Sequence, residues 1–99
     1  MMVSKKLFDN AEAAAEFLTL MGNEKRLAIM VHLLEGEMTV GAIAGKVSLS
    51  QSALSQHLAK LRGLDLVGTR RDRQMIYYSC KSDAVRKVLH TLDGIFGDA

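Results

Sequence analysis

The sequence contains no proline and no tryptophan, and Cys80 is its single cysteine. Together with 48% hydrophobic and 24% charged residues, the lack of proline fits a globular, mostly helical protein rather than a disordered chain. One thiol cannot form a disulfide within the chain, which agrees with a reducing compartment. No apolar run approaches the roughly 18 to 20 residues that cross a bilayer, and the first residues lack the apolar core of a secretory signal. We therefore expect a cytoplasmic protein with no membrane partner.

The net charge of the chain is small, but its positive charge is concentrated in one segment. The net charge of +2 is too small to indicate a nucleic-acid partner by itself. Between residues 55 and 81, however, six cations stand against two acids: Lys60, Arg62, Arg70, Arg71, Arg73 and Lys81 against Asp65 and Asp72. A chain of 99 residues also buries only about 60 to 65% of its unfolded surface when it folds alone. Its size therefore favours a dimer.

Apolar residues at spacings of three and four predict four helices, over residues 7–21, 24–35, 40–47 and 51 to about 62. Asn23 and Ser50 are residues that cap helix N-termini, and Leu49 precedes the fourth helix where a hydrophobic staple would stand. The expected inner positions are Leu7, Ala11, Ala15, Leu18 and Met21 in the first helix, Leu27, Met30, Val31 and Leu34 in the second, and Leu54, Leu58 and Leu61 in the fourth.

The last third of the chain predicts a β-hairpin and a final helix. Residues 66–71 and 74–79 are rich in β-branched and aromatic side chains and flank the polar pair Asp72-Arg73. Ser82 then caps a helix that ends at Gly97. A short turn joins the third and fourth helices. The order of four helices, hairpin and helix therefore predicts a mainly α protein, a single winged helix-turn-helix domain over residues 1–99.

The polar face of the helix predicted from Gln51 has the chemistry of a DNA-reading surface. A step of 100° per residue places four residues opposite the leucines and two beside them: Ser52, Gln56, Ala59 and Gly63, then Ser55 and Lys60. Hydroxyl and amide groups suit the major groove, where Gln56 can pair with adenine for roughly 1 to 3 kcal/mol of discrimination. An ordinary solvated face is the alternative. Arg70, Arg71 and Arg73 crowd the tip of the hairpin without an equal number of acids, and such unpaired arginines favour a phosphate or minor-groove partner.

Three segments of the chain are familiar: Asn23-Glu24-Lys25-Arg26-Leu27-Ala28-Ile29, Leu49-Ser50-Gln51-Ser52-Ala53-Leu54-Ser55-Gln56-His57-Leu58, and the arginine-rich hairpin that ends Ile76-Tyr77-Tyr78. They resemble the ArsR/SmtB family of bacterial regulators, and the match covers nearly the whole chain. The resemblance implies a sequence-specific transcriptional regulator that binds an imperfect inverted repeat in duplex DNA as a homodimer. We expect it to act as a repressor, and activation through the displacement of another protein is the alternative. A winged helix used only for protein contacts is the alternative from another class.

The resemblance and the helical patterns together assign two sets of residues. The expected DNA contacts are Arg26, Gln51, Ser52, Ser55, Gln56, His57, Lys60, Arg70, Arg71 and Arg73. The expected dimer contacts lie on the first and last helices: Leu7, Ala11, Ala15, Leu18, Val85, Leu89, Leu92 and Phe96. A core that a single chain covers by itself is the alternative to the dimer.

Many members of the family sense metals, but this sequence departs from both of the family's metal sites. The cysteine-containing box corresponds here to Glu37-Met38-Thr39-Val40-Gly41-Ala42-Ile43, which lacks both thiolates. Of the site in the last helix only Asp83, His90 and Asp93 remain, and Val85 replaces an expected histidine. We therefore expect no cofactor and no obligatory metal. The alternative function is a metal- or small-molecule-responsive sensor with its ligand at the last helix or the dimer interface.

The chain lacks the residue patterns of an enzyme. His32 and His57 have no serine, cysteine or carboxylate at a catalytic spacing, and no paired carboxylates or phosphate-binding glycine loop occur. His90 and Asp93 lie three residues apart, which permits a weak zinc or nickel site but favours an ordinary surface pair. We expect Cys80 to be a passive residue.

Overall fold

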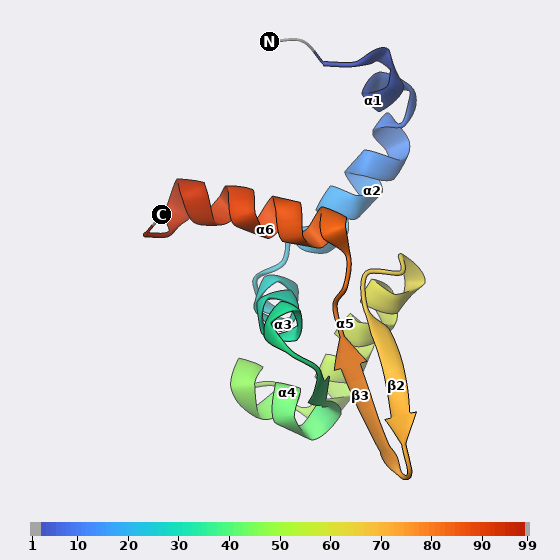
Figure 1. Cartoon of the computed structure of the whole chain (residues 1–99), viewed down its shortest axis with the longest axis vertical. Coiled ribbons are helices and arrows are strands. Elements are labelled where there is room, and N and C mark those ends of the chain that lie inside the picture. Colours follow the sequence, from blue (N-terminus) through green and yellow to red (C-terminus); the bar gives the residue numbers. More distant parts are fainter. Residues whose placement is uncertain (1–2, 99) are drawn as a thin grey trace.

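The computed structural model describes residues 3–98, which form helices and a small antiparallel sheet (Figure 1). The helices are α1 (Lys5–Asp9), α2 (Ala11–Met21), α3 (Glu24–Glu35), α4 (Val40–Val47), α5 (Gln51–Gly63) and α6 (Asp83–Phe96). The strands are β1 (Met38–Thr39), β2 (Gly68–Asp72) and β3 (Met75–Ser79), in the spatial order β1-β3-β2. Helices α4 and α5 followed by the β2–β3 hairpin make a winged helix-turn-helix, which confirms the predicted fold class.

Side-chain caps fix where α3, α5 and α6 begin. Asn23, Ser50 and Ser82 each accept a hydrogen bond from the backbone N–H three residues later, at 3.0, 3.2 and 3.2 Å. Each bond satisfies an N–H group that the first helical turn leaves without a backbone partner. The starts of α3, α5 and α6 are therefore where the sequence predicts them.

The helix predicted over residues 7–21 is divided in two at Asn10. The Asn10 side chain donates a hydrogen bond to the Lys6 carbonyl at 2.8 Å, and its backbone leaves the helical region at φ −104° and ψ 19°. Asparagine side chains compete for backbone groups in this way, which weakens a helix interior. Helices α1 and α2 therefore follow each other as an arm that rises away from the body of the molecule (Figure 1).

The sheet differs from the predicted hairpin in two ways. Asp72 pairs with Met75, so the turn residues are Arg73 and Gln74, one position later than predicted, and Arg73 takes a left-handed conformation with φ 59°. A third strand, β1, also pairs with β3. This strand has two residues, which is too few to leave an alternating pattern in the sequence.

The core lies between α3, α4, α5 and the start of α6. Its completely buried side chains are Ile29, Met30, Leu33, Ile43, Leu54, Leu58, Leu61 and Val85. The three leucines of α5 are buried as predicted, whereas α3 is rotated relative to the prediction, because Ile29 and Leu33 are buried and Val31 is exposed. Since α5 packs through its leucines, its opposite face points outward. Within residues 3–98, no helix is both long and apolar enough to span a membrane.

Candidate nucleic-acid interface

The turn between α4 and α5 determines how the exposed helix enters the structure. Ser48 takes the left-handed conformation with φ 56°, and the Leu49 N–H donates back to the Ala44 carbonyl at 3.1 Å. Leu49 also packs against the core. Lys25 Nζ donates to the Val47 carbonyl at 2.7 Å, which ties α3 to the end of α4. These contacts hold the start of α5 in one orientation.

The outward face of α5 carries five of the ten residues predicted to contact DNA. The exposed residues on this helix include Gln51, Ser52, Ser55, Gln56, Ala59, Lys60 and Gly63. Gln51 lies near the start of α4, since a Cβ added at Gly41 would lie 3.8 Å from its Nε2 atom. The structure therefore leaves these groups accessible to a partner, and their contacts with DNA stay a prediction.

Arg26 and His57 do not belong to this exposed face. Both are half-buried, and Arg26 Nη1 lies 3.3 Å from His57 Nδ1 while Arg26 Nε donates to the Leu20 carbonyl at 2.7 Å. Burial, followed by the positive charges of Arg26 and Lys60, lowers the pKa of His57 below its ordinary value. Both side chains therefore make contacts within the protein. These contacts do not support the predicted role of Arg26 and His57 in contacting DNA.

The strand register divides the arginines of the wing between two faces of the sheet. Tyr78 lies opposite Thr69 and packs against the core, and Arg71 shares that face because it is two residues further along β2. Arg70 lies opposite Tyr77 and points to the other face. Arg71 therefore projects from the side of the sheet that faces the core, whereas Arg70 projects from the outer side.

Arg70 forms an ion pair with Glu37, although the sequence predicted an arginine without an acidic partner. Its Nη2 and Nε atoms donate to the two carboxylate oxygens of Glu37 at 2.6 and 3.1 Å, and its guanidinium lies 4.7 Å from the centre of the Tyr77 ring. The hydrogen bond from Arg70 lowers the pKa of Glu37. This corrects the expectation of three unpaired arginines on the wing.

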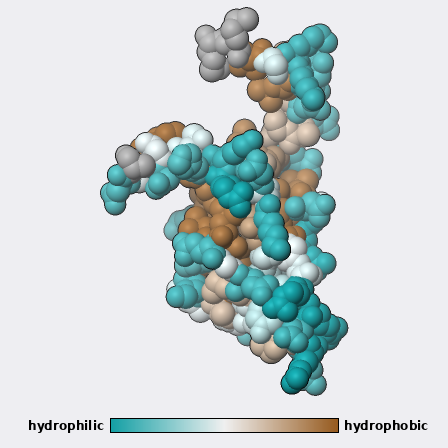
Figure 2. Space-filling model, in the orientation of Figure 1, coloured by the Kyte–Doolittle hydropathy of each residue, from teal (hydrophilic) through white to brown (hydrophobic). Residues whose placement is uncertain are grey.

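The tip of the hairpin carries the remaining positive charge of the wing. Arg71 and Arg73 are exposed, and Arg71 Nε donates to the Arg73 carbonyl at 3.1 Å, which links the strand to the turn. Figure 2 shows the hydrophilic surface at this tip, at the lower end of the molecule. The two guanidinium groups therefore stand at the end of the β2–β3 hairpin, on the same molecule as the polar face of α5.

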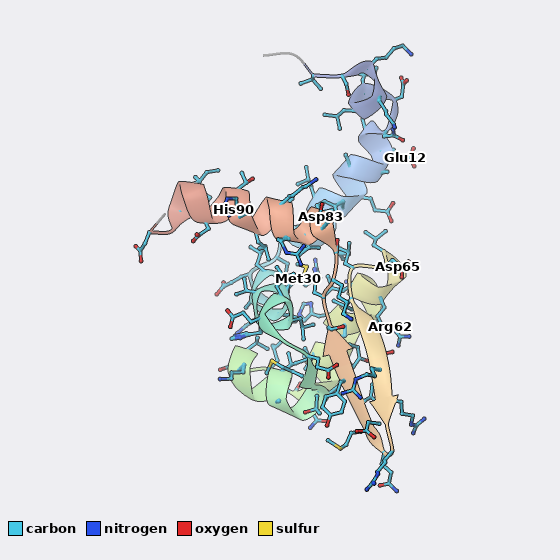
Figure 3. The ribbon with its side chains drawn as sticks, viewed as in Figure 1. Glu12, Met30, Arg62, Asp65, Asp83 and His90 are labelled. Carbon is cyan, nitrogen blue, oxygen red and sulfur yellow. The ribbon has the colours of Figure 1, made fainter. Side chains whose placement is uncertain are left out.

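The residues that resemble part of a metal site do not form a chelating group within one chain. Figure 3 shows Asp83 near the start of α6 and His90 further along it. Asp83 pairs with Lys87 at 3.1 Å and with Arg86 at 3.4 Å. Among residues 3–98, no three His, Cys, Asp or Glu side chains gather closely enough to hold a metal ion. A metal site at α6 would therefore need ligands from a second molecule.

Most of the residues assigned to a dimer interface are accessible in the single chain. Leu7, Ala11, Ala15, Leu18 and Phe96 are exposed, and Leu89 and Leu92 are half-buried. Val85 is 0% exposed and belongs to the core, so its assignment to the interface is wrong. The sequence placed it there because its position on α6 continues the stripe of Leu89, but the first turn of α6 lies over α3.

Two large apolar side chains were missed by the sequence analysis. Phe8 is 80% exposed, and Ile95 is exposed beside Phe96, which is itself 81% exposed. Phe8 lies three residues before Ala11, and Ile95 lies three residues after Leu92. These spacings would have placed both side chains beside the two predicted apolar stripes. An apolar groove of about 410 Å³ between α3 and α6 continues this surface, lined by Leu27, Val31, Leu89, Leu92, Asp93, Phe96 and Gly97. Figure 2 shows apolar surface on the arm and beneath α6.

Cys80 lies at the edge of the core. It is 4% exposed, and its backbone N–H donates to the Leu33 carbonyl at 3.3 Å. Burial raises the pKa of the thiol. A thiol that stays protonated reacts slowly with oxidants, which agrees with the passive role expected for Cys80.

Comparison with known proteins places this geometry among transcriptional regulators. The profile described as "Bacterial regulatory protein, arsR family" matches residues 23–69. The nodulation protein NolR of Rhizobium meliloti is 61% identical over 90 residues, which are 91% of this chain and 74% of NolR. The transcriptional activator HlyU of Vibrio cholerae is 41% identical over 90 residues, covering 91% and 83% of the two chains. The crystal structure of NolR from Sinorhizobium fredii has a TM-score of 0.89 at 56% identity, covering 100% of this chain and 99% of that one.

Proposed function

This chain belongs to the ArsR family of bacterial regulatory proteins, which are transcriptional regulators rather than enzymes, and we propose that it binds an inverted-repeat DNA operator as a homodimer. The observation that carries the proposal is the exposed polar face of α5 beside the arginine-tipped hairpin. In a winged helix-turn-helix, a helix in this position enters the major groove while the wing reaches the adjacent backbone or minor groove.

Gln56 is the residue of α5 best suited to read a base. It is exposed on the second turn of the helix, and a glutamine amide offers one donor and one acceptor side by side, which matches N6 and N7 of adenine. Ser52 and Ser55 stand one turn before it and beside it, where short hydroxyl groups reach bases or phosphates. Lys60 follows one turn later and suits a phosphate.

The exposed apolar surface of the arm and of α6 supports the homodimer. Phe8, Leu18, Ile95 and Phe96 are large apolar side chains that each leave more than half of their surface exposed in the single chain, and exposed apolar surface of this kind marks interaction sites. A second copy with the same surface would cover it by twofold symmetry. Two recognition helices related by that symmetry read two half-sites in opposite directions, which is why the operator is proposed to be an inverted repeat. The chain over residues 1–99 would then be one DNA-binding domain that dimerises through its first and last helices.

Repression is the proposed direction of regulation. A dimer whose two recognition helices and wings lie along one face of the duplex covers the bases and the backbone of its operator, and such coverage of a promoter blocks access to it. The relative HlyU carries the name of an activator, so the direction is measured by transcription from the bound promoter with and without the protein.

In vitro selection from randomised duplexes, followed by fluorescence anisotropy, tests the proposal. We expect the selected sequences to share two inverted half-sites about 10 base pairs apart, or a multiple of that distance. Gln56→Ala should then weaken binding to the selected duplex by roughly 1 to 3 kcal/mol and relax the preference at one position in each half-site. An equal loss on every duplex would show that Gln56 is not the reader. Failure to bind any duplex at low salt would overturn the proposed function.

A further inference from the structure

We infer that Arg26 and His57 are positioning residues that orient α5 for operator reading through a hydrogen bond that exists only while His57 is neutral. The inference rests on the proposed DNA-binding function. It assigns to these residues a role inside the protein in place of a contact with DNA, and it makes operator recognition sensitive to acid.

Arg26 joins three helices with one side chain. It lies on the first turn of α3, where its backbone N–H is held by the Asn23 side chain at 3.0 Å. Its Nε atom donates to the Leu20 carbonyl near the end of α2 at 2.7 Å, and its Nη1 atom lies 3.3 Å from His57 Nδ1 on α5. The guanidinium is planar and rigid, so the two contacts fix the distance between α2 and α5.

The chemistry of the two groups determines the protonation state of the ring. An arginine side chain has donors and no acceptor, so His57 Nδ1 must accept the hydrogen bond and the ring proton must be on Nε2. A protonated imidazole donates from both nitrogens and has no lone pair to offer. Protonation of His57 therefore removes the hydrogen bond and places two cations against each other at this position.

The surroundings of His57 favour the neutral ring. Arg26 from α3 and Lys60 from α5 both lower its pKa, after the larger effect of burial. Glu16 from α2 lines the same groove as Arg26 and Lys60, but it is not among the groups that shift the pKa of His57. The link is therefore made at neutral pH and is lost when the solution becomes acidic.

The positioning role predicts an effect of acid opposite to that of a direct phosphate contact. A histidine that touches phosphate gains charge in acid and strengthens DNA binding, as any added cation does. The loss of the Arg26–His57 link instead frees α5 to shift, and Gln56, the preceding residue of the helix, moves with it. Specific binding should then weaken in acid, whereas binding that depends on charge alone should not.

The experiment measures binding by fluorescence anisotropy at about pH 7.5 and about pH 5.5, on the duplex obtained by selection and on an unrelated duplex of the same length. His57→Asn keeps an acceptor oxygen near the position of Nδ1 but cannot take up a proton. Arg26→Lys keeps the charge but has one nitrogen, which cannot replace both the Nε and the Nη1 contacts. His90→Gln on α6 is the matched control, because it removes an exposed histidine outside the link.

We expect acid to weaken wild-type binding to the selected duplex about fivefold relative to the unrelated duplex, the equivalent of one ordinary hydrogen bond. His57→Asn should keep the neutral-pH affinity of the wild type and lose the acid effect, and His90→Gln should behave as wild type. Arg26→Lys should weaken specific binding by about the same factor already at neutral pH. Tighter specific binding of the wild type in acid, the same acid effect in His57→Asn, or full affinity of Arg26→Lys would overturn the inference.

A measurement without DNA separates this inference from the proposed function. Nitrogen-15 NMR of the free protein should show an unprotonated Nδ1 in the His57 ring at about pH 7.5, and Arg26→Gln should raise the pKa of that ring toward its ordinary value. A protonated Nδ1 at that pH would disprove the link. If the protein bound no duplex at all, the proposed function would fail, while the NMR spectrum would still decide whether the link exists.

Discussion

Glu37 and Arg70 are joined across the full width of the sheet. Glu37 directly precedes β1 at one edge, Arg70 lies on β2 at the other, and the Arg70 guanidinium lies over the Tyr77 ring of the central strand. Both carboxylate oxygens accept hydrogen bonds from the guanidinium, at 2.6 and 3.1 Å. An exposed ion pair adds little stability, but two-point geometry fixes the position of the arginine. The pair therefore fixes the guanidinium of Arg70 against Glu37 and the Tyr77 ring.

Replacement of Glu37 by alanine should release Arg70 and strengthen binding to any duplex. One additional phosphate contact would make the dependence of the logarithm of affinity on the logarithm of salt concentration steeper by about 0.9 for each wing. Glu35→Ala is the matched control, because it removes the same charge two residues earlier from an exposed side chain at the end of α3. Anisotropy titrations over a range of salt concentrations measure the slope. Equal slopes for the two variants would show that Arg70 is not released.

Replacement of Arg71 by alanine should weaken the binding of all duplexes alike. Arg71 projects from the core-facing side of the sheet and is exposed at the hairpin tip, and in a winged helix-turn-helix a cation at this place can meet the DNA backbone or the minor groove. The salt dependence should become shallower by about 0.9 for each phosphate that the variant no longer neutralises. Lys87→Ala, which removes an exposed cation from α6, is the control and should leave the slope unchanged. A weakening confined to the selected duplex would instead make Arg71 a reader of sequence.

Replacement of Phe96 or Phe8 by serine should convert the proposed dimer into monomers. Each substitution replaces an exposed apolar side chain at the end of one of the two stripes with a hydroxyl group, and the burial of one such ring is worth roughly 1.5 to 3 kcal/mol per side chain. Ile76→Ser on the wing is the control, since Ile76 is also a large exposed apolar residue but lies outside both stripes. Sedimentation equilibrium reports the mass. A dimer that persists in both Phe96→Ser and Phe8→Ser would disprove this placement of the interface.

The sequence predicted those features that depend on local chemistry. The caps at Asn23, Ser50 and Ser82 and the buried leucines of α5 follow from residues a few positions apart, and the structure confirms them. The errors arise where distant residues decide the outcome. Val85 is buried because α6 begins over α3.

Contacts between polar side chains account for the remaining differences. The pairing of Arg70 with Glu37 joins residues 33 positions apart, and the contact of Arg26 with His57 joins residues 31 positions apart. A charge count along the chain identified the positive segment, but it could not tell which cations the folded protein has already paired. The break between α1 and α2 at Asn10 is a local feature. The sequence pattern concealed it, because the apolar residues before and after Asn10 keep the spacing of one continuous helix.

The free energy of unfolding should decrease as the solution becomes mildly acidic, and His57 should be the cause. Burial, then Arg26 and Lys60, hold the pKa of His57 below its ordinary value of 6.5. The unfolded chain therefore binds a proton more readily than the folded chain, so stability is greatest above about pH 6.5 and falls as the pH drops from there toward the lowered pKa. Glu37, whose pKa is lowered from 4.5, changes the free energy of unfolding only in a more acidic range.

Urea unfolding of the wild type and of His57→Asn, at several values between about pH 7.5 and 5, tests this prediction. The free energy of unfolding of the wild type should decrease relative to that of His57→Asn as the pH falls. A difference that stays constant over this range would mean that His57 has the same pKa in the folded and unfolded chains.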